Sequence, residues 1–186
     1  MTGATEPEPE SESDPGMVAR VNYRREGAGD LLRYIERGTR RPLRNSAGRA
    51  ISAEEREAFL RRSRDRGFTR SVVLSVPDHV EATPRLDDRE IGRATRRVMN
   101  EQLRDAPGAR YVYGIHEDTD HRHAHIALTG SERELTWDRE DLDQLRERAD
   151  ERFIERHREI GRPFDRDRHR GQERAVGRDQ GRTRER

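Results

Sequence analysis

Three histidines, His116, His123 and His125, lie within a span of ten residues and could together bind a metal ion. The apolar run Tyr111–Ile115 predicts one strand, His125–Leu128 predicts another, and the polar stretch between them predicts the turn. Successive side chains of a strand alternate between its faces, so His123 and His125 point the same way, and a hairpin brings His116 opposite them. Three imidazoles on one sheet face are typical of a metal site with open coordination positions.

Two other polar groups of the predicted turn are candidates for a supporting role. His121 belongs to the turn, where its geometry suits metal coordination less well. Asp118 follows His116 by two residues and could orient the ligand imidazole through a hydrogen bond. The alternative interpretation is that Asp118 is only a turn residue. The histidines elsewhere in the chain are expected to be ordinary surface residues.

The elements that must position these side chains alternate between strand and helix patterns. Asp30 is the predicted N-cap of the first helix, Gly38 is its predicted stop, and Ser52 with Glu55 forms a capping box that opens the second. Besides the two strands of the hairpin, the sequence predicts strands at 17–23 and 71–76, and helices at 30–37, 52–64, 87–104 and 138–160. This order predicts an α+β fold with a mainly antiparallel sheet flanked by helices.

The chain of 186 residues is long enough for one ordinary domain, but only 29% of it is apolar and 41% is charged. We therefore expect a small core and solvated ends. Residues 1–16 are predicted to be a disordered acidic leader, residues 17–161 the folded domain, and residues 162–186 a disordered arginine-rich tail.

Positive charge gathers near the start of the predicted domain. Residues 17–67 carry 14 arginines and 7 acids, and the whole chain lacks lysine. Arginine binds phosphate through planar, bidentate contacts, which suits a nucleic-acid partner. Genome composition could explain the choice of arginine over lysine, but not its concentration in this segment. The predicted DNA contacts are Arg20, Arg24, Arg25, Arg33, Arg37, Arg40, Arg41, Arg44 and Arg49.

Composition also bears on where the protein works. The chain has no cysteine, so it can form no disulfide framework and carries no information on its redox compartment. No apolar run approaches the roughly 18 residues of a membrane span. Residues 1–16 are acidic and lack the apolar segment of a secretory signal. We therefore expect a cytoplasmic protein with no membrane span.

The stretch His-Glu-Asp-Thr-Asp-His-Arg-His-Ala-His-Ile closely resembles the metal-binding motif of the plasmid mobilization relaxases, which are endonucleases of the HUH superfamily. His116, His123 and His125 match the three ligand positions of that motif, and Asp118 matches its acidic position. Arg122 departs from the family pattern, because many members have proline or a small residue before the His-x-His pair. Family proteins are also usually longer than this chain.

Two further segments, in the expected order, extend the resemblance over roughly residues 17–130. Val72-Val-Leu-Ser-Val-Pro77 resembles the family's strand that ends in serine ahead of the long helix. Residues 30–38 resemble its N-terminal helix with the catalytic tyrosine, which corresponds to Tyr34. Both segments carry little information alone and gain weight from their order.

The resemblance implies a metal-dependent enzyme that nicks single-stranded DNA at a specific site and strand. In the family a tyrosine attacks a phosphodiester and becomes joined to the 5′ phosphate, so the strand can later be transferred. The implied cofactor is Mg²⁺ or Mn²⁺, and three imidazoles would also accept Zn²⁺. The implied partners are single-stranded DNA at a transfer origin, together with accessory mobilization or coupling proteins.

Tyr34 is the predicted nucleophile among four tyrosines. Tyr111 and Tyr113 have the opposite strand parity to His116, so they should pack on the other face of the sheet. Tyr34 lies on the first helix with arginines beside it, and Tyr23 is the second choice. The alternative interpretation is that Tyr34 is a half-buried anchor for its helix.

Other functions remain open from the sequence. A rolling-circle replication initiator or an accessory DNA-binding protein could share this fold, although such initiators usually place their tyrosine after the histidine motif. His121-Arg-His123-Ala-His125 also looks like the alternating triad of metal-independent nucleotidyl hydrolases. In that interpretation Arg122 breaks the apolar alternation and His116 has no role.

Overall fold

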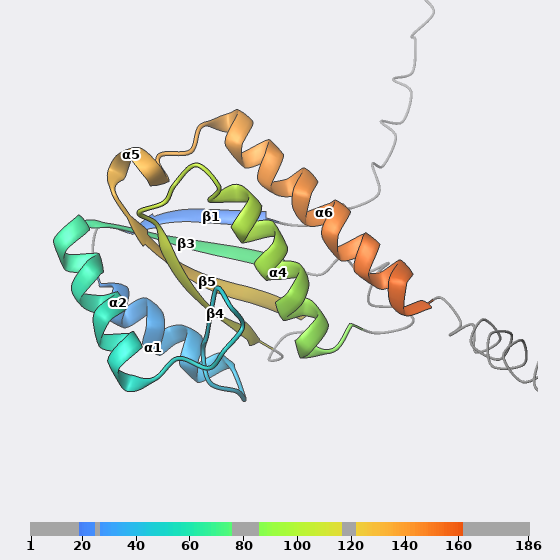
Figure 1. Cartoon of the computed structure of the whole chain (residues 1–186), viewed down its shortest axis with the longest axis horizontal. Coiled ribbons are helices and arrows are strands. Elements are labelled where there is room, and N and C mark those ends of the chain that lie inside the picture. The colour runs from blue at the N-terminus through green and yellow to red at the C-terminus, as the bar shows by residue number, and fades with distance from the viewer. Residues whose placement is uncertain (1–18, 25–26, 76–85, 117–121, 162–186) are drawn as a thin grey trace, which may run out of the picture.

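A computed structural model describes residues 19–24, 27–75, 86–116 and 122–161, without the side chains of residues 23–24 and 157–161. Within these residues, five strands form one antiparallel sheet in the order β1-β3-β5-β4-β2 (Figure 1). Their bounds are β1 Ala19–Arg24, β2 Arg44–Asn45, β3 Phe68–Ser75, β4 Arg110–His116 and β5 His123–Gly130. The predicted leader, the predicted tail and the predicted turn of the hairpin fall outside the described residues, except Arg122.

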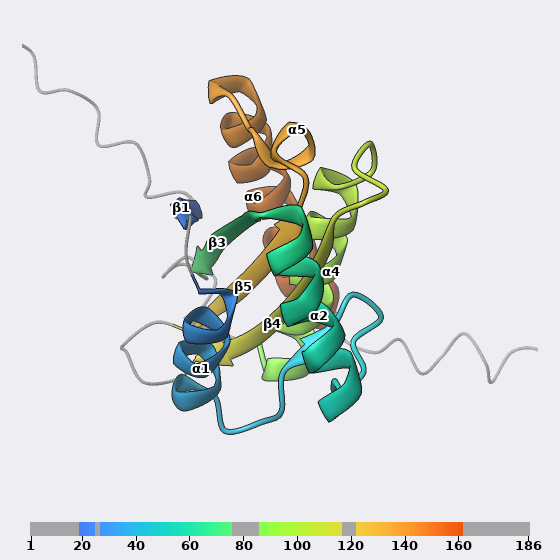
Figure 2. The same cartoon turned by 90° about the vertical axis from the view of Figure 1, so that its left-hand side faces the viewer.

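Helices cover both faces of the sheet (Figure 2). One face carries α1 (Ala28–Gly38) and α2 (Ala53–Arg66), and the other carries α4 (Asp88–Gln102) and α6 (Arg139–Gly161). A short α5 (Glu132–Leu135) joins β5 to α6. The predicted α+β fold, an antiparallel sheet flanked by helices, is confirmed.

Strand alternation divides the interior into two clusters. The larger lies between the sheet and α4 and α6, and its fully buried members include Ile126, Leu128, Met99 and Phe153. Tyr111 and Tyr113 belong to this cluster, as their parity predicted. The smaller cluster lies under α1 and α2 and includes Leu31, Leu32, Ile35, Val112 and Ala127. Alternate residues of β4 therefore serve different cores.

Helix starts follow the predicted capping chemistry in the second helix but not in the first. Ser52 and Glu55 form the expected capping box at the start of α2. The prediction that Asp30 caps α1 is wrong, because the N-cap is Gly27 at φ 73°. Asp30 lies inside the first turn and pairs with Arg33. An acid is favoured at either place, since the helix dipole attracts negative charge throughout the first turn.

Two short elements went unpredicted. β2 lies between the first two predicted helices, where no strand was predicted, and α5 follows the histidine hairpin directly. β3 also begins three residues before its predicted start, at Phe68. Among the helices in the described ranges, none combines the length and the apolar character that crossing a bilayer requires.

Candidate metal centre

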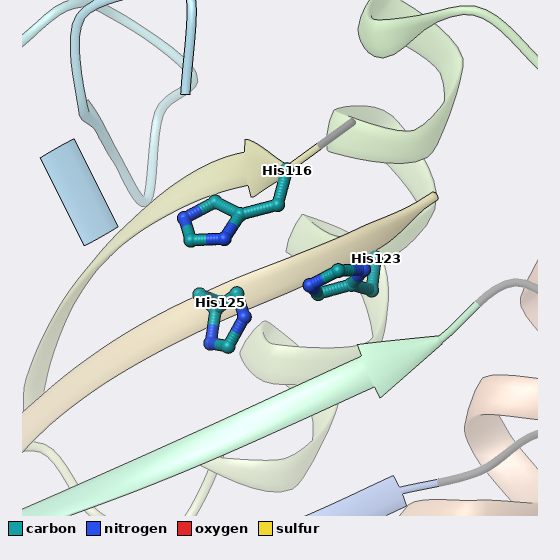
Figure 3. A group of neighbouring side chains, drawn as sticks. All are labelled: His116, His123 and His125. Carbon is teal, nitrogen blue, oxygen red and sulfur yellow. The ribbon is translucent and has the colours of Figure 1, made fainter. Parts of the chain in front are cut away.

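The register of the β4–β5 hairpin brings the three histidines together. His116 pairs directly with His123, and Gly114 pairs with His125, so all three side chains leave the same face of the sheet. Ring centroids are 4.1 Å apart for His116 and His125, 4.7 Å for His123 and His125, and 5.4 Å for His116 and His123. Figure 3 shows the three rings gathered on this face. The predicted convergence is therefore present.

The group could hold a metal ion. Each histidine offers one ring nitrogen, and these atoms lie within 4.8 Å of one another. Nitrogens bound to one ion at about 2.1 Å are about 3 to 4 Å apart, so small ring rotations would bring all three nitrogens to the spacing that one ion requires. His116 and His125 are buried, and His123 is half-buried. Neutral imidazoles suit borderline transition metals, and three of them leave coordination positions for substrate.

Helix α1 fixes the orientation of the first of these rings. The Nε2 atom of His116 lies 2.9 Å from the carbonyl oxygen of Ile35, in the last turn of α1. The last carbonyls of a helix lack partners within the helix and accept hydrogen bonds from elsewhere. When Nε2–H donates to this carbonyl, Nδ1 carries the lone pair that a metal requires.

Two glycines allow α1 to approach the hairpin this closely. A β-carbon at Gly38 would lie 2.2 to 2.6 Å from three atoms of the His116 ring. A β-carbon at Gly114 would lie 2.7 Å from a methyl carbon of Ile35. Gly38 does not have a positive φ, so the close approach, and not backbone conformation, requires glycine there.

Tyr34 lies beside two of the three histidines. Its ring centroid is 5.2 Å from that of His125, in an edge-on arrangement, and 5.7 Å from that of His116. The side chain is 45% exposed, whereas its neighbour Ile35 is fully buried and anchors the helix. The phenol is thus next to the imidazole group and accessible to solvent.

Tyr111 and Tyr113 are placed less favourably for chemistry at this centre. Tyr111 donates to Asn100 at 2.9 Å, and Tyr113 accepts from Arg96 at 2.8 Å, both on the opposite side of the sheet. Burial raises the pKa of the Tyr111 phenol well above its ordinary value, so ionisation there is disfavoured. The side chain of Tyr23 lies outside the described part of the chain.

Three predicted DNA-contact arginines lie on elements that flank the histidines. Arg20 of β1 pairs with Val73 of β3, which pairs with His125, so the three positions share one sheet face. Arg20 is exposed there, and Arg33 and Arg37 are exposed on α1, to either side of Tyr34 in sequence. Ser75, the serine singled out from the sequence, lies directly opposite His123.

The remaining predicted contacts are more dispersed. Arg41 pairs with Asp88 at 3.0 Å, and Arg44 donates to the carbonyl of Gly48 at 2.7 Å. Arg40 and Arg49 are exposed in the segment between α1 and α2. Asp118, Arg25 and the side chain of Arg24 lie outside the described residues, so their predicted roles stay predictions.

Sequence reasoning missed the contribution of Gly38 and of the Ile35 carbonyl. A glycine at a helix end is already explained as a helix stop, so the sequence gives no reason to expect a contact between Gly38 and His116.

No family model matches the chain, and no curated protein and no solved structure matches it either. The relaxase resemblance therefore depends on the motif residues and their order.

Proposed function

We propose that the chain is a metal-dependent endonuclease that nicks single-stranded DNA through Tyr34, in the manner of the plasmid mobilization relaxases that its motif resembles. One observation carries this proposal. The ring centroid of the accessible Tyr34 lies 5.2 Å from that of His125 and 5.7 Å from that of His116, two members of a group that could hold a metal ion.

The chemistry follows from the groups at the site. A divalent ion held by the three imidazoles would stabilise, as a Lewis acid, the negative charge that builds on the non-bridging phosphate oxygens. The hydroxyl oxygen of Tyr34 attacks phosphorus while its proton passes to water. The bond from phosphorus to the 3′ oxygen breaks and the 3′ oxygen takes a proton from water, which leaves a 3′ hydroxyl and a 5′-phosphotyrosine. This ester conserves the phosphodiester bond energy, so a 3′ hydroxyl can reverse the reaction and rejoin the strand.

The donor set narrows the choice of ion without fixing it. We propose Mn²⁺ or Mg²⁺ as the working ion, and Zn²⁺ is also compatible with three nitrogen ligands. Because Mg²⁺ prefers oxygen ligands, the three imidazoles favour Mn²⁺ over Mg²⁺.

Arginines on adjoining elements support a DNA substrate. Arg20 is exposed on the sheet face that carries the histidines, and Arg33 and Arg37 are exposed on α1. Guanidinium groups there would bind the phosphates that flank the scissile bond. We propose single-stranded DNA from a transfer origin as the partner, with accessory mobilization proteins, and this function places the chain in the cytoplasm.

The test is formation of a covalent adduct. The protein is incubated with single-stranded oligonucleotides from the origin region of its own replicon and Mn²⁺ or Mg²⁺, then denatured and separated by electrophoresis. A protein–DNA band should survive denaturation, and Tyr34→Phe should abolish it. If the Tyr34→Phe protein still forms the band and the Tyr23→Phe protein does not, Tyr34 is not the nucleophile. If the wild-type protein forms no band with any origin oligonucleotide, the nuclease proposal fails.

Chelation separates this proposal from its main enzymatic alternative. A nucleotidyl hydrolase of the alternating-histidine type would use a histidine nucleophile and stay active in EDTA. The convergence of His116 on His123 and His125 supports the metal-dependent function, because the alternating triad does not use His116. A rolling-circle initiator would share the tyrosine chemistry, and neighbouring transfer or replication genes would distinguish the two.

A further inference from the structure

A second polar feature lies away from the histidines, between α2 and the β2–β4 edge of the sheet. It is a hollow of about 650 Å³ whose floor includes Ile51, Phe59 and Val112. Arginines dominate the charges around it. They are Arg49, Arg61, Arg62, Arg66 and Arg110, against the two acids Glu55 and Asp65.

Two of these guanidinium groups are held in place by neutral partners. Arg62 donates through Nε and Nη2 to the carbonyl of Gly108, at 3.2 Å and 2.6 Å. Arg110 donates through Nη1 to the carbonyls of Pro107 and Ala109, at 2.8 Å and 2.6 Å. A carbonyl does not neutralise the cation, and a guanidinium has five N–H donors, so both groups are oriented while retaining charge and donors for an anion.

The two acids offset only part of this charge. The Glu55 carboxylate accepts from the backbone N–H of Ser52 at 2.8 Å and from the side chain of Asn45 at 3.1 Å. These hydrogen bonds, with a smaller contribution from the charge of Arg49, lower the pKa of Glu55, so its carboxylate stays ionised and offsets one of the five arginines. Arg61 and Arg66 are exposed on the helix side of the hollow. The five arginines therefore exceed the acids by three charges.

The hollow and the histidines lie along one strand. Val112, in the floor, precedes His116 by four residues on β4 and has the same parity. At about 3.3 Å per residue, the two positions are roughly 13 Å apart along the strand. A polynucleotide bound at the histidines would reach the hollow within a few nucleotides.

We propose that this arginine-lined hollow binds the phosphodiester backbone of DNA that extends from the nick site, and this inference rests on the proposed DNA substrate. Oriented arginines around a concave surface suit phosphate oxygens, which accept bidentate hydrogen bonds. The contact carries no base specificity, because phosphates are the same in every sequence.

The experiment compares two double variants that remove the same charge. Arg61→Gln/Arg66→Gln removes two arginines of the hollow, and Arg64→Gln/Arg139→Gln removes two exposed arginines outside its lining. Arg64 is a close match for Arg66, since both lie in the last turn of α2. Fluorescence anisotropy measures binding of the full chain to a labelled 30-nucleotide strand and to the matching duplex, in EDTA and at several salt concentrations.

The hollow variant should bind the preferred DNA form at least tenfold more weakly at low salt, and its slope of log affinity against log salt should fall by roughly 1 to 2. The control variant should stay within twofold of wild type. The proposal is overturned if the two variants bind alike, or if the wild-type protein binds neither DNA form.

Failure of this inference can be told from failure of the proposed function. Selective loss of DNA binding in the hollow variant, without any Tyr34 adduct in the wild type, supports DNA binding by the hollow and rejects the proposed nuclease function. A Tyr34 adduct in the wild type, with the two variants binding DNA alike, rejects DNA binding by the hollow and supports the proposed nuclease function.

Discussion

Gly38 lies against the imidazole of His116 so closely that no β-carbon fits between them. The same helix supplies the Ile35 carbonyl to the Nε2 atom of that imidazole, and carries Tyr34 one turn before its end. One element thus positions both a candidate metal ligand and the candidate nucleophile. Shifts of this helix should therefore affect metal affinity and strand cleavage together.

The substitution Gly38→Ala should weaken metal binding. Its β-carbon would displace the His116 ring, and loss of a ligand-orienting contact typically costs 10- to 100-fold in metal affinity. Isothermal titration calorimetry with Mn²⁺ or Zn²⁺ measures this change directly.

Gly29→Ala is the matched control on the same helix. A β-carbon at Gly29 would meet its nearest atoms at 3.8 Å and 3.9 Å, which is ordinary contact. Metal affinity should stay at the wild-type value, and the free energy of unfolding should rise by up to about 1 kcal/mol, because alanine favours helix. Equal metal affinity for Gly38→Ala and Gly29→Ala would show that Gly38 does not position the ligand.

Removing any one of the three histidines should abolish stabilisation by metal. An ion at 100 times its dissociation constant stabilises the native state by about 2.7 kcal/mol, which a thermal unfolding scan detects. His116→Ala, His123→Ala and His125→Ala should each lose this increase in melting temperature. His121→Ala should retain it, because the turn histidine is the weaker ligand candidate. A wild-type melting temperature that does not respond to Mn²⁺, Zn²⁺ or Mg²⁺ would contradict the metal site.

Tyr34 should contribute little to stability. Its side chain is 45% exposed, whereas Ile35 beside it is fully buried. Tyr34→Phe should change the free energy of unfolding by less than about 0.5 kcal/mol, and Ile35→Ala should cost about 2 to 5 kcal/mol. Chemical denaturation measures both. If Tyr34→Phe instead costs as much as a core substitution, the phenol is an anchor of the helix and loss of the adduct would have a structural cause.

The sequence was sufficient to predict the histidine group, because strand parity and a short hairpin are local properties. His116 and His123 pair across one turn, and His125 follows with the same parity. The opposite placement of Tyr111 and Tyr113 followed from the same alternation. The antiparallel sheet with flanking helices was predictable from the order of the patterns.

Contacts between distant segments could not be predicted in this way. The approach of Gly38 and Ile35 to His116 depends on how α1 docks, across about 80 residues of chain. The hollow beside α2 likewise requires β2 to pair with β4, and β2 has only two residues. Neither the local pattern nor the composition of residues 39–50 distinguishes such a short strand from a loop.

Glu134 should make the free energy of unfolding depend on pH in the acid range. Its carboxylate accepts from the backbone N–H and the hydroxyl of Ser131, and from the backbone N–H of Gly108 at 2.6 Å. The pKa of Glu134 is lowered mainly by the hydrogen bonds to Ser131, with smaller contributions from Gly108 and Arg66. A carboxyl whose pKa is lowered in the native state stabilises the fold above its ordinary pKa of 4.5, and this contribution is lost as pH falls through the native value.

Glu134→Gln should therefore be less stable than wild type near neutral pH and should lose less stability between about pH 6 and pH 3. Glu132→Gln, an exposed acid in the same short helix, is the control and should keep the wild-type profile. Urea denaturation at a series of pH values measures both. Parallel profiles for wild type and Glu134→Gln would mean that the carboxylate charge at Glu134 does not stabilise the turn between β5 and α6.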